Sequence, residues 1–387
     1  MIYKIAIIGA GASGLMFLSK LKKHKGTALI DKNSFAGEKI KISGGGKCNI
    51  SNRDISTEHY LGDSEFLENL FKKFDKNWIL DFCRENGFNP KLNEKNISGS
   101  YFCNSSKDIL GVLKTGLKKA RPFFNREVLD LSLEDDIFRI ETSGGDVFAE
   151  KVVVASGGLS YPNLGATNIA FKIAEKFGHK IEKLNPALVG FTVQKEQFWF
   201  KNLSGVSLNA KAKIGEKTLN GDILFTHKGC SGPLILNSSL FWKKGQIELD
   251  FMPNFKIETF LHQKGNISTV LPLPKRFLKE FLNSISLKDK SMENLNSDEV
   301  AKLKILKNYS FSPAGNFGYS RAEATKGGIS TNEISENFES KLQKNLYFIG
   351  ENLDITGEVG GYNFILHSLL LFNPLPISIR FFLLILF

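Results

Sequence analysis

The chain has 387 residues, of which 42% are hydrophobic and 24% are charged; this is the composition of a globular protein and excludes both a disordered chain and one embedded wholly in a membrane. A single core stops growing at about 250 to 300 residues, so we expect two or three domains. The formal net charge of +11 suits an anionic partner, but the lysines are scattered along predicted helices without interleaved aromatic residues, so we interpret them as solvated helix faces and expect neither a nucleic acid nor a membrane partner.

The first elements in the chain predict a βαβ unit. Residues 3–8 are a continuous apolar run, as in a parallel strand that is covered on both faces. The segment 12–25 places three leucines on one helical stripe, and 27–32 supplies a second strand. The chain therefore begins as an α/β protein.

The following region is predicted to be helical and then antiparallel. Residues 64–87 and 105–122 have the pattern of amphipathic helices, the first ended by a glycine and the second by a proline. Residues 127–150 alternate like antiparallel strands joined by two turns, and a buried strand over 151–156 follows. We expect this last strand to rejoin the first sheet.

Strict alternation returns between residues 188 and 251 without intervening helices, which indicates a separate antiparallel β-barrel or sandwich. A small helical segment follows, and residues 344–354 return to a strand-then-helix pattern, so the first domain is discontinuous. The expected parts are the first portion of the nucleotide-binding domain at 1–187, the inserted β domain at 188–255, the helical segment at 256–311, the last portion of the first domain at 312–364, and an apolar tail at 365–387.

The strongest local signal is the stretch Gly9-Ala10-Gly11-Ala12-Ser13-Gly14, between the first strand and the first helix. Its first glycine allows a tight turn, the second lets a pyrophosphate approach the backbone, and the third lets the helix pack closely on the strand. The N–H groups that begin the helix favour an anion. Asp31 closes the second strand and can accept from a ribose hydroxyl. We predict a dinucleotide site; the alternative is a glycine-rich turn that only packs.

Two downstream strands indicate which dinucleotide binds. Residues 152–158 and 346–354, together with the first strand, resemble the FAD-binding pattern of glutathione-reductase-like flavoproteins. That resemblance makes Glu351 and Asp354 candidates for the ribityl chain and Gly350 a candidate for close approach to phosphate. No second GxGxxG is present for a dedicated NAD(P) domain, so a nicotinamide would bind only transiently.

The resemblance is more specific in seven segments that occur in order along the chain. In them the sequence resembles the BaiN/RdsA-type (aminoacetone oxidase-like) family of NAD(P)/FAD-dependent oxidoreductases. The resemblance implies a glutathione-reductase-like FAD-binding Rossmann domain with an inserted antiparallel β-barrel and a small helical segment. It also implies FAD as the cofactor and NAD(P)H as a transient donor. The segments are 37–52, 187–193, 205–211, 224–236, 324–330, 338–357 and 360–363.

The resemblance also implies a loop of three glycines and a lysine against the FAD, where the glycines free the backbone and the lysine offsets diphosphate charge. The full set of predicted cofactor contacts is Gly9, Gly11, Ala12, Ser13, Gly14, Asp31, Lys39, Gly44, Gly45, Gly46, Lys47, Cys48, Asn49, Val128, Ala155, Ser156, Gly157, Gly350, Glu351, Asp354, Gly360, Gly361, Tyr362 and Asn363.

Three side chains are candidates for catalysis, each with a structural alternative. Cys48 is either a redox thiol or a structural one, and no second cysteine is close in sequence to resolve a disulfide. His227 is either a proton donor or a turn cap. Tyr362 is either an acid near the flavin or a ring that packs on it. Because the four cysteines lack CxxC spacing and metal-ligand neighbours, and the N-terminus enters a strand at once, we predict a reduced, cytoplasmic protein without a metal.

We interpret the sequence as an FAD-dependent oxidoreductase that transfers hydride from a nicotinamide donor to a small organic acceptor, an activated C=C bond or a carbonyl, for which the protein supplies orientation and electrostatics. One alternative is a flavoprotein that acts on or binds tRNA. The sequence leaves the substrate and the oligomeric state open.

A further alternative is a cofactor-deficient chain. The family pattern stops at Phe364, and residues 365–387 hold one formal charge, Arg380, and two prolines that interrupt a helix. We consider three interpretations of this tail: a frame change or replaced end, a divergent tail, or a membrane anchor. A membrane span needs about 20 apolar residues, and the longest run free of proline and charge here is shorter. On the first interpretation, the helix that should hold Gly360 to Asn363 is missing and FAD is weakly retained.

Overall fold

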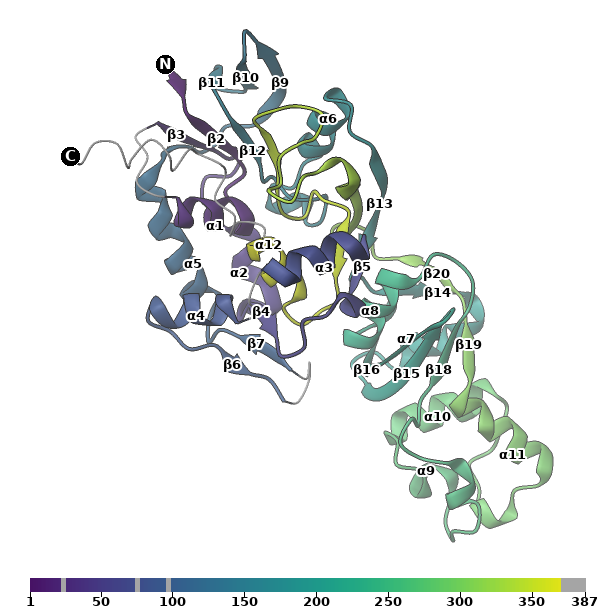
Figure 1. The fold of residues 1–387 in the computed structure, drawn as a ribbon. Helices are drawn as coiled ribbons and strands as arrows, with labels where there is room; N and C mark the ends of the chain where they lie inside the picture. The colour runs from purple at the N-terminus through teal and green to yellow at the C-terminus, as the bar shows by residue number, and fades with distance from the viewer. Residues whose placement is uncertain (22–25, 74–76, 95–98, 370–387) are drawn as a thin grey trace. The chain divides into compact units, whose positions relative to one another are not determined.

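The computed structural model describes residues 1–21, 26–73, 77–94 and 99–369 (Figure 1). It divides into two compact units: unit 1 comprises Met1–Asn185 and the chain from Ala324 onward, and unit 2 comprises Pro186–Glu323. Unit 2 is thus inserted into unit 1 in the sequence. Each unit has its own hydrophobic cluster of buried side chains.

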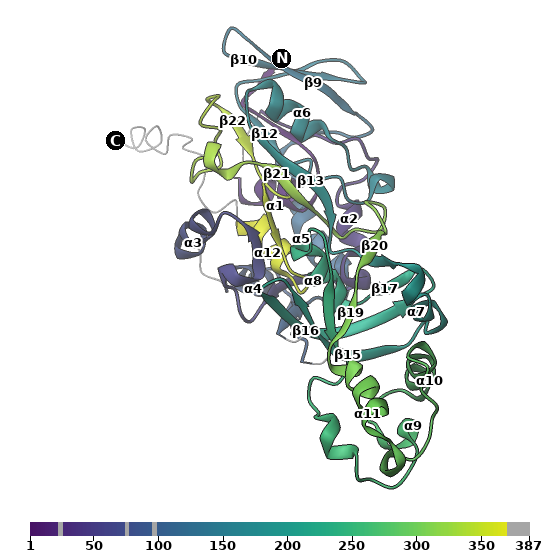
Figure 2. The ribbon, with the colours of Figure 1, turned by 90° about the vertical axis from the view of Figure 1, so that its right-hand side faces the viewer.

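The centre of unit 1 is a five-stranded parallel sheet in the order β22-β12-β2-β3-β8. Its inner strands are fully buried because their residues are apolar on both faces. Segments far apart in the sequence lie side by side, such as β12 and β22 in Figure 2. The strands are β2 (Ile5–Ile8), β3 (Thr27–Ile30), β8 (Arg121–Phe123), β12 (Val152–Val154) and β22 (Leu346–Phe348).

A second, four-stranded sheet contains the two hairpin turns that the sequence predicted. Its order is β1-β11-β10-β9, where β1 (Ile2–Tyr3) pairs in parallel with β11 (Val147–Ala149) and the remaining pairs, with β10 (Ile137–Thr142) and β9 (Val128–Glu134), are antiparallel. The single strand expected at 3–8 is therefore two strands in different sheets. Lys4 separates the two strands, and its N–H donates to the Gly26 carbonyl at 2.8 Å.

Helices and short sheets complete unit 1. The helix expected at 64–87 is two helices, α3 and α4, and the one expected at 105–122 ends its α-helical part at Lys114. Helix α1 contacts α5 and α12. The helices are α1 (Ala12–Lys20), α2 (Glu38–Ile42), α3 (Ser64–Lys73), α4 (Trp78–Glu85), α5 (Ser106–Lys114), α6 (Ile169–Lys176) and α12 (Tyr362–Leu369). The short sheets are β4 (Asn49–Asn52) with β7 (Ser100–Phe102) and β6 (Lys91–Leu92), β5 (Tyr60–Gly62) with β23 (Ile355–Gly357), and β13 (Ile181–Ala187) with β21 (Ala324–Ile329).

Unit 2 is built on a seven-stranded antiparallel sheet in the order β19-β18-β15-β16-β17-β14-β20. In the described part of the chain β19 and β20 stand at the two ends of this order, and Ser312 alone separates them in the sequence, so the two edges lie near each other. No pairing between them closes the sheet among the described residues, and the expected barrel stays a prediction. The strands are β14 (Phe191–Val193), β15 (Ser207–Ile214), β16 (Lys217–Thr226), β17 (Gly229–Ser231), β18 (Ile247–Asp250), β19 (Tyr309–Phe311) and β20 (Pro313–Asn316).

The helices of unit 2 include a small cluster between β18 and β19. There α10 buries one apolar face, and an Asn296–Glu299 capping box begins α11. The chain remains in unit 2 as far as Glu323, beyond the expected boundary at residues 311 and 312, because β20 pairs with β14. The helices are α7 (Trp199–Asn202), α8 (Pro233–Phe241), α9 (Ile267–Val270), α10 (Lys275–Ser284) and α11 (Ser297–Leu303).

The described chain ends in helix α12, whose Ile365 and Leu366 are buried in the core of unit 1. A helix therefore does follow the Gly360–Gly361 loop, contrary to the expectation that it is missing. Residues 370–387 of the predicted tail lie outside the described residues. None of the helices among the described residues has both the length and the apolar character needed to cross a membrane.

Candidate cofactor site

Three loops of unit 1 meet at the carboxyl edge of the parallel sheet. They follow β2, β12 and β22, the neighbouring strands whose loops form ligand crevices in open α/β sheets. A Cβ added to Gly9 would lie 2.5 Å from the Ala155 carbonyl oxygen, and one on Gly350 would lie 2.3 Å from Ser13 Oγ. Gly9 and Gly350 also have positive φ. Gly9 is required because its loop approaches the backbone after β12, and Gly350 because its loop approaches the Ser13 side chain at the start of α1.

Within the same loops other glycines border open space. A Cβ on Gly14 would lie 1.9 Å from the Gly9 carbonyl oxygen, but a Cβ on Gly11 would have no atom within 4 Å. Gly157, at φ +75°, is equally open. Helix α1 begins here without a side-chain cap and with no acidic residue in its first turn. Its N-terminus therefore offers a positive, unhindered surface to a phosphate.

Ser156 adds an unsatisfied group to this surface. Its Oγ is buried and has no hydrogen-bond partner among the described residues. A buried hydroxyl without a partner costs about 1 to 3 kcal/mol, and such groups are rare in native proteins. The open glycines, the uncapped helix and this hydroxyl together fit the diphosphate of FAD.

Asp31 holds the glycine loop in place. Its Oδ2 accepts from the Ala10 N–H at 2.5 Å, and its Oδ1 accepts from the Asn33 N–H at 2.7 Å. Burial raises the pKa of this carboxyl, and the two N–H donors oppose that shift. Each oxygen keeps a second lone pair that can accept from a ribose hydroxyl. That predicted bond stays a prediction.

Lys39 and Glu351 form an ion pair at 2.6 Å. The other oxygen of Glu351 accepts from the Thr325 N–H at 3.0 Å. Thr325 Oγ1 in turn accepts from the Leu159 N–H at 2.8 Å and lies 3.1 Å from Ser160 Oγ. Sequence reasoning did not select Thr325, although it lies in the family-like segment 324–330. This network ties the loops after β12 and β22 to β21.

Asp354 differs from its neighbour Glu351. Its carboxyl accepts from the Gly327 N–H, and burial is the main cause of a raised pKa, with a further contribution from Glu182. The protein thus gives this carboxyl a backbone partner in the β21 region. Its predicted contact with the ribityl chain stays a prediction.

The triple-glycine loop is wound in the left-handed region. Gly44, Gly45 and Gly46 have φ values of 57°, 64° and 85°, and Cys48 follows at 53°. The Cys48 thiol is fully buried, and burial raises its pKa to about 12. It is therefore a neutral thiol at pH 7, which supports the structural interpretation over the redox one. Next to it, Lys47 lies over the Phe102 ring at 5.6 Å.

The Gly360–Gly361 loop packs on strand β4. A Cβ on Gly361 would lie 2.3 Å from the Ser51 carbonyl oxygen, and Asn52 Nδ2 donates to the Gly360 carbonyl at 3.2 Å. The Asn363 amide closes the turn, because its Oδ1 accepts from the Gly357 N–H and its Nδ2 donates to the Gly357 carbonyl, both at 2.8 Å. Asn363 thus orders the loop through its own side chain.

Tyr362 belongs to a partly buried polar cluster that was not predicted from the sequence. Its ring stacks on His59 with centroids 4.5 Å apart, and burial raises the pKa of its phenol. His59 Nδ1 lies 3.3 Å from Glu358 Oε2, and its Nε2 lies 3.3 Å from Asp54 Oδ2. The bond to Glu358 is the main cause of a raised pKa at His59. The two carboxylates thus favour the protonated form of the imidazole beside the Gly360–Gly361 loop.

The sequence matches the HI0933-like protein Rossmann domain family over residues 3–367. The chain belongs to the HI0933-like family. It is 35% identical over 377 residues to a ribosomal RNA dihydrouridine synthase of Escherichia coli, which covers 92% of this chain and 93% of that protein. The ribosomal RNA dihydrouridine synthase of Haemophilus influenzae is 33% identical over 380 residues, with 92% and 94% covered. A 3-dehydro-bile acid delta(4,6)-reductase of Clostridium scindens is 27% identical over 396 residues, with 93% and 95% covered.

These relatives confirm the BaiN/RdsA-type resemblance and place the HI0933-like chain among Rossmann-type FAD-dependent oxidoreductases. The match to residue 367 also passes Phe364, where the resemblance was expected to stop. Among solved structures, the 3-ketosteroid-delta4-(5alpha)-dehydrogenase of Rhodococcus jostii RHA1 is similar in fold, with a TM-score of 0.51, 12% identity and 95% of both chains covered.

Two predicted site residues of this HI0933-like chain belong to elements other than the loops described above. His227 belongs to unit 2, where it is exposed in the turn between β16 and β17. Val128 is buried at the start of β9 in the four-stranded sheet. Their assigned roles stay predictions. Within the described stretches of the chain, no three His, Cys, Asp or Glu side chains are grouped as a metal ion would require.

Proposed function

We propose that this protein is an FAD-dependent reductase of a C=C bond conjugated with a carbonyl, and that its substrate is a uridine of ribosomal RNA. The supporting observation is the nearly full-length similarity, at 35% and 33% identity, to two ribosomal RNA dihydrouridine synthases. The open space at Gly11 and Gly157 in unit 1 supports the binding of FAD there.

The names of the relatives share one chemistry. Dihydrouridine is uridine whose C5–C6 double bond, conjugated with the C4 carbonyl, has gained two hydrogens. The bile acid relative is named as a delta(4,6)-reductase of a 3-dehydro acid, so its double bonds are conjugated with a 3-keto group. In both substrates, hydride adds at a carbon conjugated with the carbonyl and a proton completes the reduction. This agrees with the activated C=C acceptor expected from the sequence.

The choice of RNA over a small molecule rests on the higher identity to the RNA enzymes and on the net charge of +11. It departs from the expectation of a small organic acceptor. We favour instead the alternative of a flavoprotein that acts on RNA, and we propose ribosomal RNA rather than tRNA as the substrate because of the two relatives.

The residues of this chain have distinct proposed roles. The N-terminus of α1, the open backbone at Gly11 and the Ser156 hydroxyl bind and orient the diphosphate of FAD. When bound, FAD supplies the redox chemistry, with NAD(P)H as the proposed source of electrons. The His59–Tyr362 pair holds a proton beside the Gly360–Gly361 loop, where the reduced base would need one.

The test is a reaction with defined components. The purified protein, NADPH or NADH and a ribosomal RNA transcript are incubated without oxygen, and the digested RNA is analysed by mass spectrometry for dihydrouridine. A Gly11→Val variant, whose side chain occupies the open pyrophosphate position, is the matched control and should give no product. Reduction of a 3-keto-4-ene steroid without any dihydrouridine would overturn the RNA assignment. A protein that purifies without flavin and cannot be reconstituted would overturn the enzyme and favour the cofactor-deficient alternative.

A further inference from the structure

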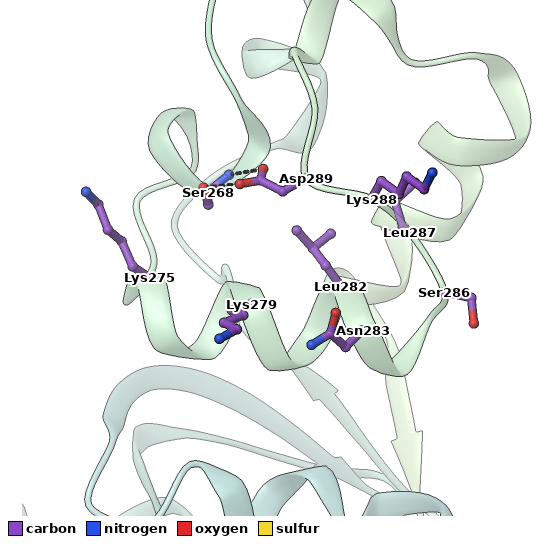
Figure 3. A pocket seen from close by; sticks show the side chains of 9 residues that line it. All are labelled: Ser268, Lys275, Lys279, Leu282, Asn283, Ser286, Leu287, Lys288 and Asp289. Atoms are coloured by element: carbon purple, nitrogen blue, oxygen red, sulfur yellow. Dashed lines mark hydrogen bonds between the residues drawn. The ribbon is translucent and has the colours of Figure 1, made fainter.

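The helical cluster of unit 2 contains a cavity of about 760 Å³. It lies between helix α10 and the segment 286–289 (Figure 3). Leu282 points into it from α10, and both Leu282 and Leu287 are buried. The cavity thus has an apolar floor, and polar side chains surround it.

Three exposed lysines stand around this cavity: Lys275 and Lys279 on α10, and Lys288 on the opposing segment. None of the three has an ion-pair partner among the described residues. Other lysines near the cluster are neutralised. The recorded pairs are Lys290 with Glu299, Lys304 with Glu258, and Lys307 with Asp250.

The positions of these lysines are electrostatically unfavourable for the protein alone. Lys275 and Lys279 are four residues apart on one helix face, and like charges at this spacing destabilise a helix. Lys275 is also the first residue of α10, which has neither a side-chain cap nor an acidic residue in its first turn. A cation therefore stands at the positive end of the helix dipole.

The carboxylate at the cavity does not offset this charge through an ion pair. Asp289 accepts from Ser268 instead, at 3.0 Å from the backbone N–H and 2.5 Å from the hydroxyl. These two bonds connect α9 to the segment opposite α10 at the edge of the cavity (Figure 3). The cavity is therefore bordered by three lysines, Lys275, Lys279 and Lys288, which we call the positive rim.

We propose that this cavity binds the phosphate backbone of the substrate RNA; the inference rests on the proposed function in its choice of ligand. Three lysines spread over two elements suit successive phosphates of a chain, because an ammonium group acts as a flexible point charge. The exposed Asn283 and Ser286 add donors and acceptors that can reach a ribose 2′-OH. The leucine floor accommodates a sugar or an unstacked base.

The test compares two triple variants with the same change in net charge. Lys275→Gln/Lys279→Gln/Lys288→Gln removes the positive rim, and Lys195→Gln/Lys211→Gln/Lys213→Gln removes three exposed lysines elsewhere in unit 2. Binding of a fluorescent ribosomal RNA transcript is measured by anisotropy over a series of salt concentrations. We expect the rim variant to bind roughly tenfold more weakly at about 150 mM salt and to lose about 2 from the slope of log K against log salt. The control variant should change little.

Equal losses in the two variants, or no loss in the rim variant, would overturn the proposal. Inorganic phosphate at millimolar concentration and matched ionic strength is a second probe. Displacement of RNA from the wild type but not from the rim variant would support the proposal, and equal displacement from both proteins would overturn it. Flavin content and thermal unfolding must be the same in all three proteins. Because the readout is binding, it also holds if dihydrouridine is never formed, so failure of the proposed reaction and failure of this site are distinguishable.

Discussion

The sheet edge of unit 1 and the core of unit 2 differ in the space around their residues and in the hydrogen bonding of their buried polar groups. In unit 2 the rings of Trp199, Phe200, Phe225 and Phe277 contact one another, and the Trp199 indole N–H donates to the Tyr309 hydroxyl at 3.0 Å. At the edge of unit 1, glycines face open space and a buried hydroxyl lacks a partner.

The difference teaches how a cofactor site can be recognised without its cofactor. In the core of unit 2 the Trp199 indole and the Tyr309 hydroxyl bond to each other, as most buried polar groups do. The predicted cofactor surface instead has open space at Gly11 and an unpaired hydroxyl at Ser156 among the described residues. The following predictions test that distinction, beginning with the largest expected effect.

Gly14→Ala and Gly11→Ala should separate packing from binding within one loop. The new Cβ at position 14 would lie 1.9 Å from the Gly9 carbonyl oxygen, whereas the one at position 11 would have no atom within 4 Å. We expect Gly14→Ala to destabilise the protein by more than about 4 kcal/mol and Gly11→Ala to fold normally but bind flavin weakly. Denaturant unfolding and flavin content measure the two effects. Equal stability of the two variants would contradict this assignment.

Phe277→Ala should unfold unit 2 while the parallel sheet of unit 1 stays folded. Phe277 is fully buried, and its ring lies 4.9 Å from Phe251 and 6.0 Å from Phe281. Loss of such a ring costs about 3 to 5 kcal/mol. We expect an early unfolding transition with flavin still bound, measured by calorimetry and flavin fluorescence. Phe198→Ala, at an exposed position beside Lys201, is the control and should cost less than about 1 kcal/mol. Simultaneous loss of flavin would show that the two cores are not independent.

Much of the local fold follows from the sequence because the decisive forces there are local. The apolar run before Gly9 gave the first core strand, and the alternation with two turns over residues 127–150 gave the β9–β10–β11 meander. The glycine loop was predictable because Gly9 combines a positive φ with a close backbone approach and Gly14 packs against Gly9, so both positions favour glycine.

Other features depend on contacts between distant residues. The separation of β1 from β2 follows from pairing with β11, and the extension of unit 2 to Glu323 follows from the pairing of β20 with β14. The His59–Glu358 pair joins residues that are 299 positions apart in the sequence. No local pattern marks His59, since a lone histidine before a strand has many structural uses.

Ser156→Ala should have opposite effects on the empty and the loaded protein. Removal of the unpartnered hydroxyl relieves a desolvation cost, so we expect the free energy of unfolding without flavin to stay equal or rise by up to about 1 kcal/mol. Flavin affinity should fall by a few-fold because a hydrogen bond to the cofactor is lost. Ser160→Ala is the matched control: its Oγ lies 3.1 Å from Thr325 Oγ1, so its removal should destabilise the empty protein. Destabilisation of the empty protein by both variants would remove Ser156 from the site.

His59→Gln should have the smallest effect, and one that depends on pH. The folded-state pKa of His59 is raised, mainly by the bond to Glu358, above that of an unfolded histidine near 6.5. A group with a raised folded pKa stabilises the protein fully below its unfolded pKa, and this contribution is lost as pH rises through the folded pKa. The variant should therefore be less stable than the wild type near pH 5.5, and the difference should shrink towards pH 8.5.

The expected difference is less than about 1 kcal/mol, because His59 is partly exposed and its partner Asp54 lies on the solvent side. Thermal unfolding at several pH values measures it, with flavin absent so that binding does not contribute. Phe277→Ala is the reference, since its cost comes from apolar packing and should not vary over the same range. A His59→Gln effect that grows with pH would mean that the neutral imidazole is the form that the cluster holds, and the proton beside the cofactor loop would then have to come from another group.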